Sequence, residues 1–256
     1  MKVAILAGGF GTRLQEETSS RPKPMVEIGG EPIIWHIMKI YASHGFKEFV
    51  IPLGYKGEMF KNYFLNYRFR ANSLSIQLDS GDIQVRGRNC EDWTVHLLDT
   101  GLNTQTGGRV KHVAEFIGKE TFMLTYGDGV SNVDIGSLLK FHRNHGSLMT
   151  VTAVRPPSRF GGISFSDESM VTFEEKPQIG EGWINGGFFV VEPGVADFIE
   201  GENTIFEREP MERLAAEGQL MGYRHHEFWQ CMDVLRDLKF LENLWQKGQA
   251  PWKVWK

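Results

Sequence analysis

Residues 3–14, VAILAGGFGTRL, decide the fold class of this chain, because they form an apolar run that leads directly into a glycine-rich loop. Val3 to Leu6 are apolar without alternation, which is typical of a strand buried on both faces. A helical pattern follows from Pro32, and a second apolar run spans Phe49 to Leu53. This order predicts a βαβ unit, with parallel strands joined by a right-handed crossover.

The same alternation of strand and helix continues along the chain. Up to Met149 helical patterns and short apolar runs take turns, and beyond it short strands dominate. A last helix is predicted from Asp233, with Gly248 closing it. We therefore expect one α/β domain with a mixed, mainly parallel sheet flanked by helices and a smaller strand-rich subregion in the second half. Helices are predicted near residues 33–41, 59–64, 110–117, 135–139 and 233–245, and further strands at 94–98, 122–125, 150–154, 162–165, 171–173 and 188–191.

Composition excludes several classes of protein. The 256 residues carry a net charge of -4 with no Lys/Arg run, which argues against a nucleic-acid binder. The two cysteines, Cys90 and Cys231, cannot form a disulfide framework and offer no CxxC zinc site. The apolar residues 3–7 are too short for a signal peptide, and no apolar run is long enough for a bilayer. We expect a cytoplasmic protein with neither nucleic acid nor membrane as a partner.

Two segments carry the chemistry. Glycines at 8, 9 and 11 would let backbone amides approach an anion, and Arg13 adds a fork suited to phosphate oxygens. The loop lacks the Gly-Lys-Ser/Thr ending of a Walker motif, and Leu14 stands where a dinucleotide fingerprint needs glycine. Lys23 lies between two prolines that stiffen its backbone. Taken alone, these segments would also fit a tight turn and a surface lysine.

Together, GGFGTRL at residues 8–14 and Lys23-Pro24 resemble the sugar-1-phosphate nucleotidylyltransferase family, and a Glu-Lys-Pro at residues 175–177 adds to the match. Within that family the resemblance is closest to the enzymes that use CTP and glucose 1-phosphate. It runs nearly from end to end. The segments that carry it are KPMVEIGG (23–30), WHIM (35–38), GYKG (54–57), TGGR (106–109), TYGDG (125–129), FG (160–161), INGGFF (184–189) and KGQAPWK (247–253).

The resemblance implies a Rossmann-like fold and Mg²⁺-assisted transfer of a cytidylyl group from CTP to glucose 1-phosphate, giving CDP-glucose and pyrophosphate. The attacking phosphate oxygen is mostly ionised at neutral pH, so no general base is needed. Catalysis then consists of positioning two polyanions and neutralising their charge. By the same resemblance, residues 1–130 form the nucleotide-binding part and residues 131–256 the sugar-phosphate-binding part.

Roles for individual residues follow from the same resemblance. Asp128 and Asp233 are the expected magnesium ligands. Asp128 also ends a buried strand, where an open α/β sheet faces its ligand, whereas Asp233 would equally fit a helix N-cap. Catalytic roles fall on Arg13 at the leaving pyrophosphate, Lys23 at the α-phosphate and Lys176 at the sugar phosphate. Nucleotide contacts are expected from Leu6, Ala7, Gly8, Gly9, Phe10, Gly11, Thr12, Arg13, Lys23, Thr104, Arg109 and Asp128. Sugar-phosphate contacts are expected from Glu175, Lys176, Asn185 and Gly186.

Three alternatives stay open at this point. The same reaction could use dTTP or UTP, the chain could be a non-catalytic nucleotide-sugar-binding module, or it could be a dehydrogenase. The resemblance further implies a homo-oligomer whose product feeds the synthesis of a surface polysaccharide. Tryptophans gather late in the chain, at Trp229, Trp245, Trp252 and Trp255, and suit either packing of the C-terminal segment or a subunit contact.

Overall fold

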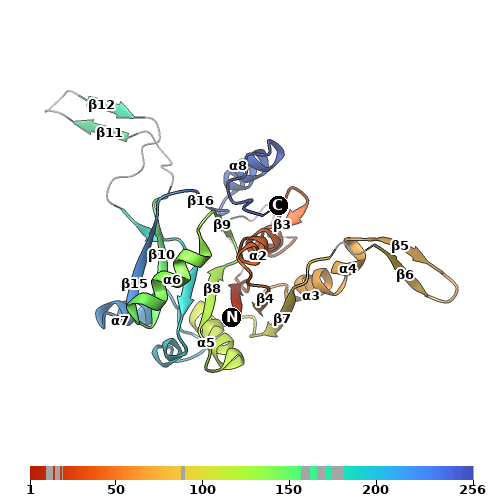
Figure 1. The fold of residues 1–256 in the computed structure, drawn as a ribbon, viewed down its shortest axis with the longest axis horizontal. Coiled ribbons are helices and arrows are strands. Elements are labelled where there is room, and N and C mark those ends of the chain that lie inside the picture. Colours follow the sequence, from red (N-terminus) through yellow and green to blue (C-terminus); the bar gives the residue numbers. More distant parts are fainter. Residues whose placement is uncertain are drawn as a thin grey trace.

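The computed structural model describes residues 1–9, 14, 18, 20–87, 90–156, 162–165, 171–174 and 182–255. At its centre is a mixed sheet of eight strands (Figure 1). From one edge to the other the order is β15, β10, the pair β13 and β14 end to end, β8, β1, β4 and β7. The strands are β1 (Val3–Leu6), β4 (Glu48–Leu53), β7 (Thr94–Asp99), β8 (Phe122–Tyr126), β10 (Met149–Val154), β13 (Ile184–Asn185), β14 (Phe189–Val191) and β15 (Leu220–His225).

The predicted βαβ beginning is confirmed. β1 pairs in parallel with β4 and with β8, and β4 pairs in parallel with β7. β14 runs antiparallel to both β8 and β10, and β15 is parallel to β10. The sheet is therefore mixed and mainly parallel, as expected, and the carboxyl ends of β1, β4, β7 and β8 meet at one edge of it.

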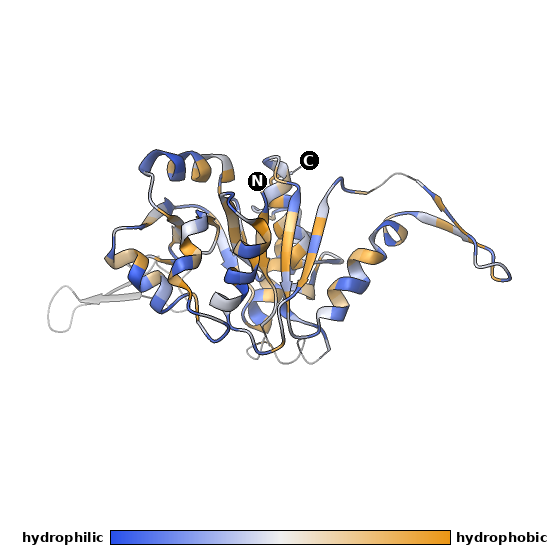
Figure 2. Ribbon diagram, turned by 90° about the horizontal axis from the view of Figure 1, so that it is seen from below, coloured by the Kyte–Doolittle hydropathy of each residue, from blue (hydrophilic) through white to orange (hydrophobic). Residues whose placement is uncertain are grey.

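Helices cover both faces of the sheet. Side chains of β1 alternate: Val3 and Ile5 join one apolar cluster, and Ala4 and Leu6 join another. The first cluster is completed by α2 (Ile33–Ser43), α6 (Ile135–His145) and α8 (Leu235–Gln246). The second is completed by α5 (Thr106–Ile117), η3 (Pro193–Phe198) and α7 (Glu209–Ala216). Figure 2 shows the apolar strands lying between these layers. A strand that is apolar on both faces needs both layers, since every side chain on it must leave water.

Helix ends agree with the sequence at α6 and differ at α8. Asp134 caps α6 by accepting a hydrogen bond from the Ser137 amide (2.9 Å), and Gly146 follows it with a φ of 68°. The predicted helix start at Asp233 is wrong by two residues, because α8 begins at Leu235. Val234 stands at the N-cap, and the Asp233 backbone N–H donates to Asp237 Oδ2 (3.0 Å).

Several elements were not predicted from the sequence. α7 and β15 are among them, and so is most of an arm that projects from the sheet edge beyond β7 (Figure 1), of which only the first helix matches a prediction, the one near residues 59–64. The arm consists of α3 (Gly57–Leu65), α4 (Tyr67–Arg70), β5 (Ser73–Ile76) and β6 (Ile83–Arg86). Two short ribbons were also missed, β2 (Glu27–Ile28) with β3 (Glu31–Pro32) and β9 (Gly129–Ser131) with β16 (Trp229–Cys231). The predicted strands β11 (Gly162–Phe165) and β12 (Val171–Glu174) pair as an antiparallel hairpin.

The late tryptophans pack mainly around α2, which confirms one of the two predicted roles. Trp252 is fully buried and stacks on Trp245, with ring centroids 6.3 Å apart. Trp245 meets the ring of His36 edge-on at 4.7 Å.

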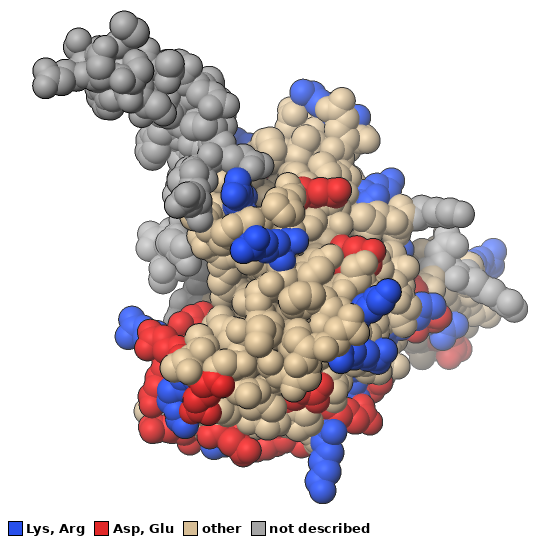
Figure 3. All heavy atoms as spheres, turned by 60° about the vertical axis from the view of Figure 1, so that its left-hand side comes forward, with Lys and Arg blue, Asp and Glu red and all other residues tan. Residues whose placement is uncertain are grey.

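Among the described helices none is long and apolar enough to cross a membrane. Figure 3 shows one face on which acidic side chains gather along the lower edge, while Lys and Arg are scattered without forming a continuous tract.

Candidate functional site

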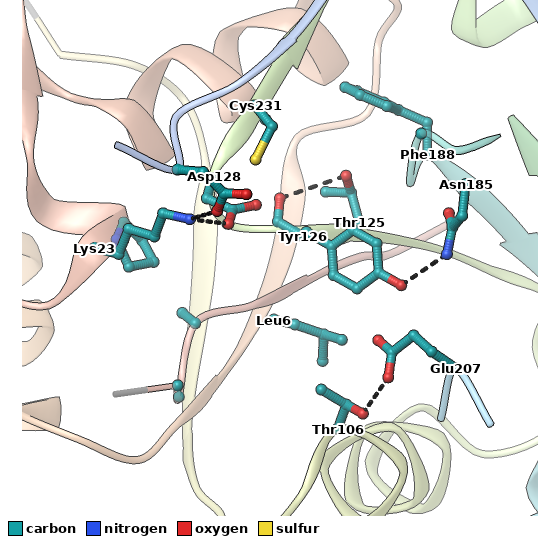
Figure 4. Close-up of a pocket in the computed structure, with 18 of the residues that line it drawn as sticks. Leu6, Lys23, Thr106, Thr125, Tyr126, Asp128, Asn185, Phe188, Glu207 and Cys231 are labelled. Atoms are coloured by element: carbon teal, nitrogen blue, oxygen red, sulfur yellow. Dashed lines mark hydrogen bonds and ion pairs between the residues drawn. The ribbon is translucent and has the colours of Figure 1, made fainter. Parts of the chain in front are cut away.

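A cavity of about 890 Å³ opens at the carboxyl ends of β1 and β8 (Figure 4). Its volume is in the upper range for a small-molecule site. Residues expected from the sequence line it at both ends, together with aromatic and acidic residues that were not expected. The expected residues at the cavity are Leu6, Ala7, Gly8, Gly9, Lys23, Thr104, Arg109, Asp128, Asn185, Gly186 and Asp233. Phe10, Gly11, Thr12, Arg13, Glu175 and Lys176 lie outside the described residues.

Lys23 links the two aspartates on one wall of the cavity. Its ammonium lies 2.7 Å from Asp128 Oδ2 and 2.5 Å from Asp233 Oδ1. Lys23 belongs to the short 3-10 helix η2 (Lys23–Met25) and is only 8% exposed. A buried ammonium needs such partners, because an isolated charge in the interior is costly. The structure thus brings together three residues that lie far apart in the sequence.

The ribbon β9–β16 positions the two aspartates. Asp128 directly precedes β9, and Asp233 comes two residues after β16. Cys231 is paired with Gly129 across the ribbon, and the Met232 amide donates to the Asp128 carbonyl oxygen (2.8 Å). Because the register is held by backbone hydrogen bonds, the two carboxylates stay on the same side of the cavity. Asp237 fixes the segment that follows, since its carboxylate accepts from the backbone amides of Asp233 and Val234.

Charge and burial shift the titration of this cluster. Burial alone would lower the pKa of Lys23, but the carboxylates of Asp128 and Asp233 and the nearby Cys231 outweigh it and raise that pKa above its usual value. Burial, followed by the charge of Asp128, raises the pKa of the Cys231 thiol well above its usual value. At neutral pH the cluster therefore holds an ammonium ion and a protonated thiol.

The cluster also has the donors for a divalent metal ion. One oxygen from each of Asp128 and Asp233 and the sulfur of Cys231 lie within 4.8 Å of one another. Two carboxylates that leave room for water and phosphate oxygens fit the way in which Mg²⁺ is usually held. The Lys23 ammonium already shows that this position attracts a cation.

Arg109 lies below the glycine loop and is 3% exposed. Its guanidinium donates to oxygens at or just beyond the carboxyl ends of β1, β4 and β7. The acceptors are the carbonyls of Leu53 (2.7 Å), Gly101 (3.0 Å), Gly8 (3.3 Å) and Leu102 (3.4 Å) and the hydroxyl of Thr100 (2.6 Å). A Cβ at Gly8 or at Gly54 would collide with this guanidinium. Both glycines are therefore required by the side chain of Arg109.

The charge of Arg109 has no carboxylate partner at salt-bridge distance in the described part of the chain. Burial lowers its pKa, but an arginine stays protonated at neutral pH. Positive charge is thus left beneath the loop at Gly8 and Gly9. Thr104, also expected here, has its hydroxyl 2.5 Å from both the Thr100 carbonyl and a carboxylate oxygen of Glu202.

The opposite end of the cavity is lined by a connected set of polar side chains (Figure 4). The amide of Asn185 donates to the Tyr126 hydroxyl (3.0 Å), and the charge of Glu207 lies close enough to act on that hydroxyl. Thr106 donates to the same Glu207 carboxylate (2.6 Å). Burial and the Glu207 charge raise the pKa of Tyr126 above its usual value. The indole of Trp229 donates to the Gly186 carbonyl (2.8 Å).

Sequence reasoning missed Tyr126, Glu207, Trp229 and Asp237 as residues of this cavity. Asp237 had a signal, because an acidic residue in the first helical turn is typical of a helix start. Tyr126 lies next to the predicted Asp128 and could have been included with it. Glu207 and Trp229 stand in no motif, and only the packing of η3, α7 and β16 brings them to the cavity.

Comparison with known proteins places this geometry in a family. Residues 2–238 match the model of the nucleotidyl transferase family. Glucose-1-phosphate cytidylyltransferase from Salmonella typhi is 50% identical over 256 residues, which is 100% of both chains. Mannose-1-phosphate guanylyltransferase 1 from Arabidopsis thaliana is 29% identical over 98% of this chain and 67% of its own length.

Solved structures agree on the fold. UDP-glucose pyrophosphorylase complexed with UDP-glucose has a TM-score of 0.69 at 17% identity, covering 96% of this chain and 98% of its own. HddC from Yersinia pseudotuberculosis complexed with GMP-PN has a TM-score of 0.68 at 20% identity, covering 95% of this chain and 99% of its own. The predicted resemblance is confirmed, and so is the expected nucleotidyltransferase activity; enzymes of this kind generally use a divalent metal. The chain belongs to the nucleotidyl transferase family.

Proposed function

We propose that this enzyme transfers the cytidylyl group of CTP to α-D-glucose 1-phosphate, giving CDP-glucose and pyrophosphate. The observation that carries the proposal is the 50% identity to a glucose-1-phosphate cytidylyltransferase over the whole chain. The cavity supports it, because one wall carries the cluster of Lys23, Asp128 and Asp233 and the other carries side chains suited to hydroxyl groups.

The reaction is an in-line displacement at phosphorus. An oxygen of the sugar phosphate forms a bond to the α-phosphorus of CTP, and the bond from that phosphorus to the bridging oxygen of pyrophosphate breaks. We propose that Asp128 and Asp233 hold Mg²⁺, which when bound offsets negative charge on the phosphates. The Lys23 ammonium then turns from the carboxylates to the α-phosphate, where it lowers the repulsion between the two anions.

We propose further roles for the residues in and around the glycine loop. Gly8 and Gly9 offer backbone amides to the nucleotide, and Leu6 and Ala7 form the floor beside them. Arg109 holds the surrounding loops and leaves its positive charge beneath the phosphates. Phe10, Gly11 and Thr12 would complete the loop, with Arg13 at the pyrophosphate. Thr104 belongs to the segment 102–105 that lines the nucleotide side of the cavity.

At the sugar end we propose that Asn185 and the backbone of Gly186 bind hydroxyl groups of glucose. Asn185 is exposed to the cavity, and its amide is oriented by Tyr126. A network that donates and accepts hydrogen bonds suits a hexose, which offers both kinds of group. Lys176 and Glu175 would bind the sugar phosphate and the ring from the segment beyond β12.

We also propose a homo-oligomer, a cytoplasmic location, and a division into a nucleotide part near residues 1–130 and a sugar-phosphate part near 131–256. The oligomer is supported by apolar side chains on the arm, where Ile76 is 53% and Ile83 48% exposed. Light scattering in solution would give the subunit number. CDP-glucose as the product would serve the synthesis of a surface polysaccharide, as the resemblance implies.

The proposal is tested by pyrophosphate release from glucose 1-phosphate and Mg²⁺ with CTP, dTTP, UTP or ATP in parallel. We expect release with CTP that exceeds release with the other three, and loss of release when EDTA removes the metal. Release with dTTP or UTP instead would keep the reaction and reject the nucleobase. No release with any triphosphate would reject the enzyme and favour a nucleotide-sugar-binding module.

A further inference from the structure

Cys231 is the one cluster member without a role in the proposed reaction. It lies at the end of β16, partly buried, and lines the cavity together with Lys23 and the two aspartates. Its partner across the ribbon is Gly129, which has no side chain to stand between the sulfur and Asp128. Figure 4 shows the sulfur on the same side as the Asp128 carboxylate, and the three donor atoms lie within 4.8 Å of one another.

The chemistry of these donors is mixed. Oxygen ligands suit Mg²⁺, whereas a thiolate favours softer ions such as Zn²⁺ and Co²⁺. Three protein ligands that leave a further position open to water or phosphate are also the usual arrangement of a reactive zinc site. Compared with a site of two carboxylates alone, a site with two carboxylates and one thiolate therefore binds softer metal ions more tightly relative to Mg²⁺.

We propose that Cys231 is a third metal ligand, and that it makes this site bind Zn²⁺ and related thiophilic ions in preference to Mg²⁺. The inference rests on the metal position proposed between Asp128 and Asp233. Binding displaces the proton of the thiol to solvent, since only the thiolate is a good ligand. Zn²⁺ would then compete with Mg²⁺ for the same position.

Charge balance supports such a site. Two carboxylates and one thiolate carry three negative charges, and Zn²⁺ together with the Lys23 ammonium carries three positive ones. Lys23 is held at this cluster by the backbone of η2, so its charge stays close even after its ammonium leaves the carboxylates. A partly buried site whose charges cancel avoids much of the cost of an unpaired ion.

The test uses Co²⁺ as a spectroscopic probe and Zn²⁺ in competition with a chromophoric chelator, on the full chain without nucleotide. The variants are Cys231→Ser, which keeps size and shape, and Cys90→Ser, the matched control at the other cysteine, which is exposed. We expect a thiolate-to-cobalt charge-transfer band in the unchanged chain and in Cys90→Ser. In Cys231→Ser the band disappears and Zn²⁺ binds on the order of tenfold more weakly or worse.

Two outcomes would overturn the inference: a Cys231→Ser variant that keeps the charge-transfer band, or one that keeps its Zn²⁺ affinity. The variant Asp128→Asn tests the metal position between the two aspartates separately from the role of the Cys231 thiol. If Asp128→Asn abolishes binding while Cys231→Ser does not weaken it, the aspartate site stands and only the role of the thiol is rejected. If neither variant weakens Zn²⁺ binding, the proposed metal position is rejected together with the inference.

Discussion

Two clusters of side chains, one at the cavity and one around His36, differ in what holds them together. At the cavity, Lys23 is kept in place by two carboxylates that lie 2.7 and 2.5 Å away. Around His36, aromatic rings pack against one another, with Trp252 fully buried. The cluster around Lys23 is held together by opposite charges and faces the cavity. The cluster around His36 is held together by burial of its rings away from water.

α8 connects the two clusters. It begins two residues after Asp233, and near its other end Trp245 packs against the ring of His36. Gly29 lies beneath the same indole, where a Cβ would collide with it. The aromatic cluster therefore anchors the helix that directly follows Asp233, one of the two carboxylates at the cavity. Changes in the first cluster should alter activity, whereas changes in the second should alter stability.

The largest expected effect is on activity. We expect Asp128→Asn to lower the rate of pyrophosphate release on the order of a thousandfold, because the amide is a poor ligand for a cation and carries no charge. Its effect on the free energy of unfolding should be small, since Lys23 keeps Asp233 as a partner.

The matched control is Asp92→Asn, which removes an exposed carboxylate that pairs with Lys47 at the surface. It should leave the rate unchanged, because exposed pairs contribute little. A rate for Asp128→Asn within tenfold of the unchanged chain would contradict the expectation that the cluster around Lys23 governs activity while the cluster around His36 governs stability.

Trp252→Ala should have its main effect on stability rather than on the rate of pyrophosphate release. Removal of a fully buried indole should lower the free energy of unfolding by about 3–5 kcal/mol, as for other large aromatic truncations in a core. The measurement is unfolding in urea, followed by circular dichroism. Phe116→Ala is the control, because Phe116 is 44% exposed and its loss should cost less than about 1 kcal/mol. Equal losses in the two variants would show that the aromatic cluster is not an anchor.

The third prediction concerns pH and the aromatic cluster. His36 Nε2 lies 2.8 Å from the Ile28 carbonyl oxygen, and Nδ1 accepts from the Trp252 indole at 3.4 Å, so both nitrogens are satisfied in the neutral ring. Burial lowers the pKa of His36 to about 4. Because the unfolded chain takes up the proton first, stability present above pH 6.5 should be lost as the pH falls towards 4. The loss amounts to about 3 kcal/mol over that range.

The measurement is the free energy of unfolding against pH, with an NMR titration of the imidazole. His36→Gln should flatten the dependence between pH 6.5 and 4. His112→Gln, at a half-buried histidine that pairs with Glu202 near the surface, should keep it. A native His36 that titrates near its ordinary pKa would contradict the neutral, dry character of this cluster.

Much of the fold and part of the site could be predicted. The apolar runs at β1, β4 and β8 were predicted because strands buried on both faces have no polar interruptions. Lys23 and Asp128 were found because their neighbours form recognisable motifs. The N-cap alternative for Asp233 was wrong, since its side chain turns to Lys23 and Val234 is the residue that precedes the first helical turn.

The sequence by itself determined the α/β class, the glycine loop after β1, and the residue types that a phosphate site requires. Only the tertiary structure decided that Lys23 lies between Asp128 and Asp233, that Cys231 joins them, and that Arg109 is satisfied by carbonyl oxygens. The physical reason is that hydrophobic periodicity is a local property of the chain. Contacts between residues a hundred or more positions apart depend instead on strand order and on the register of β9 with β16.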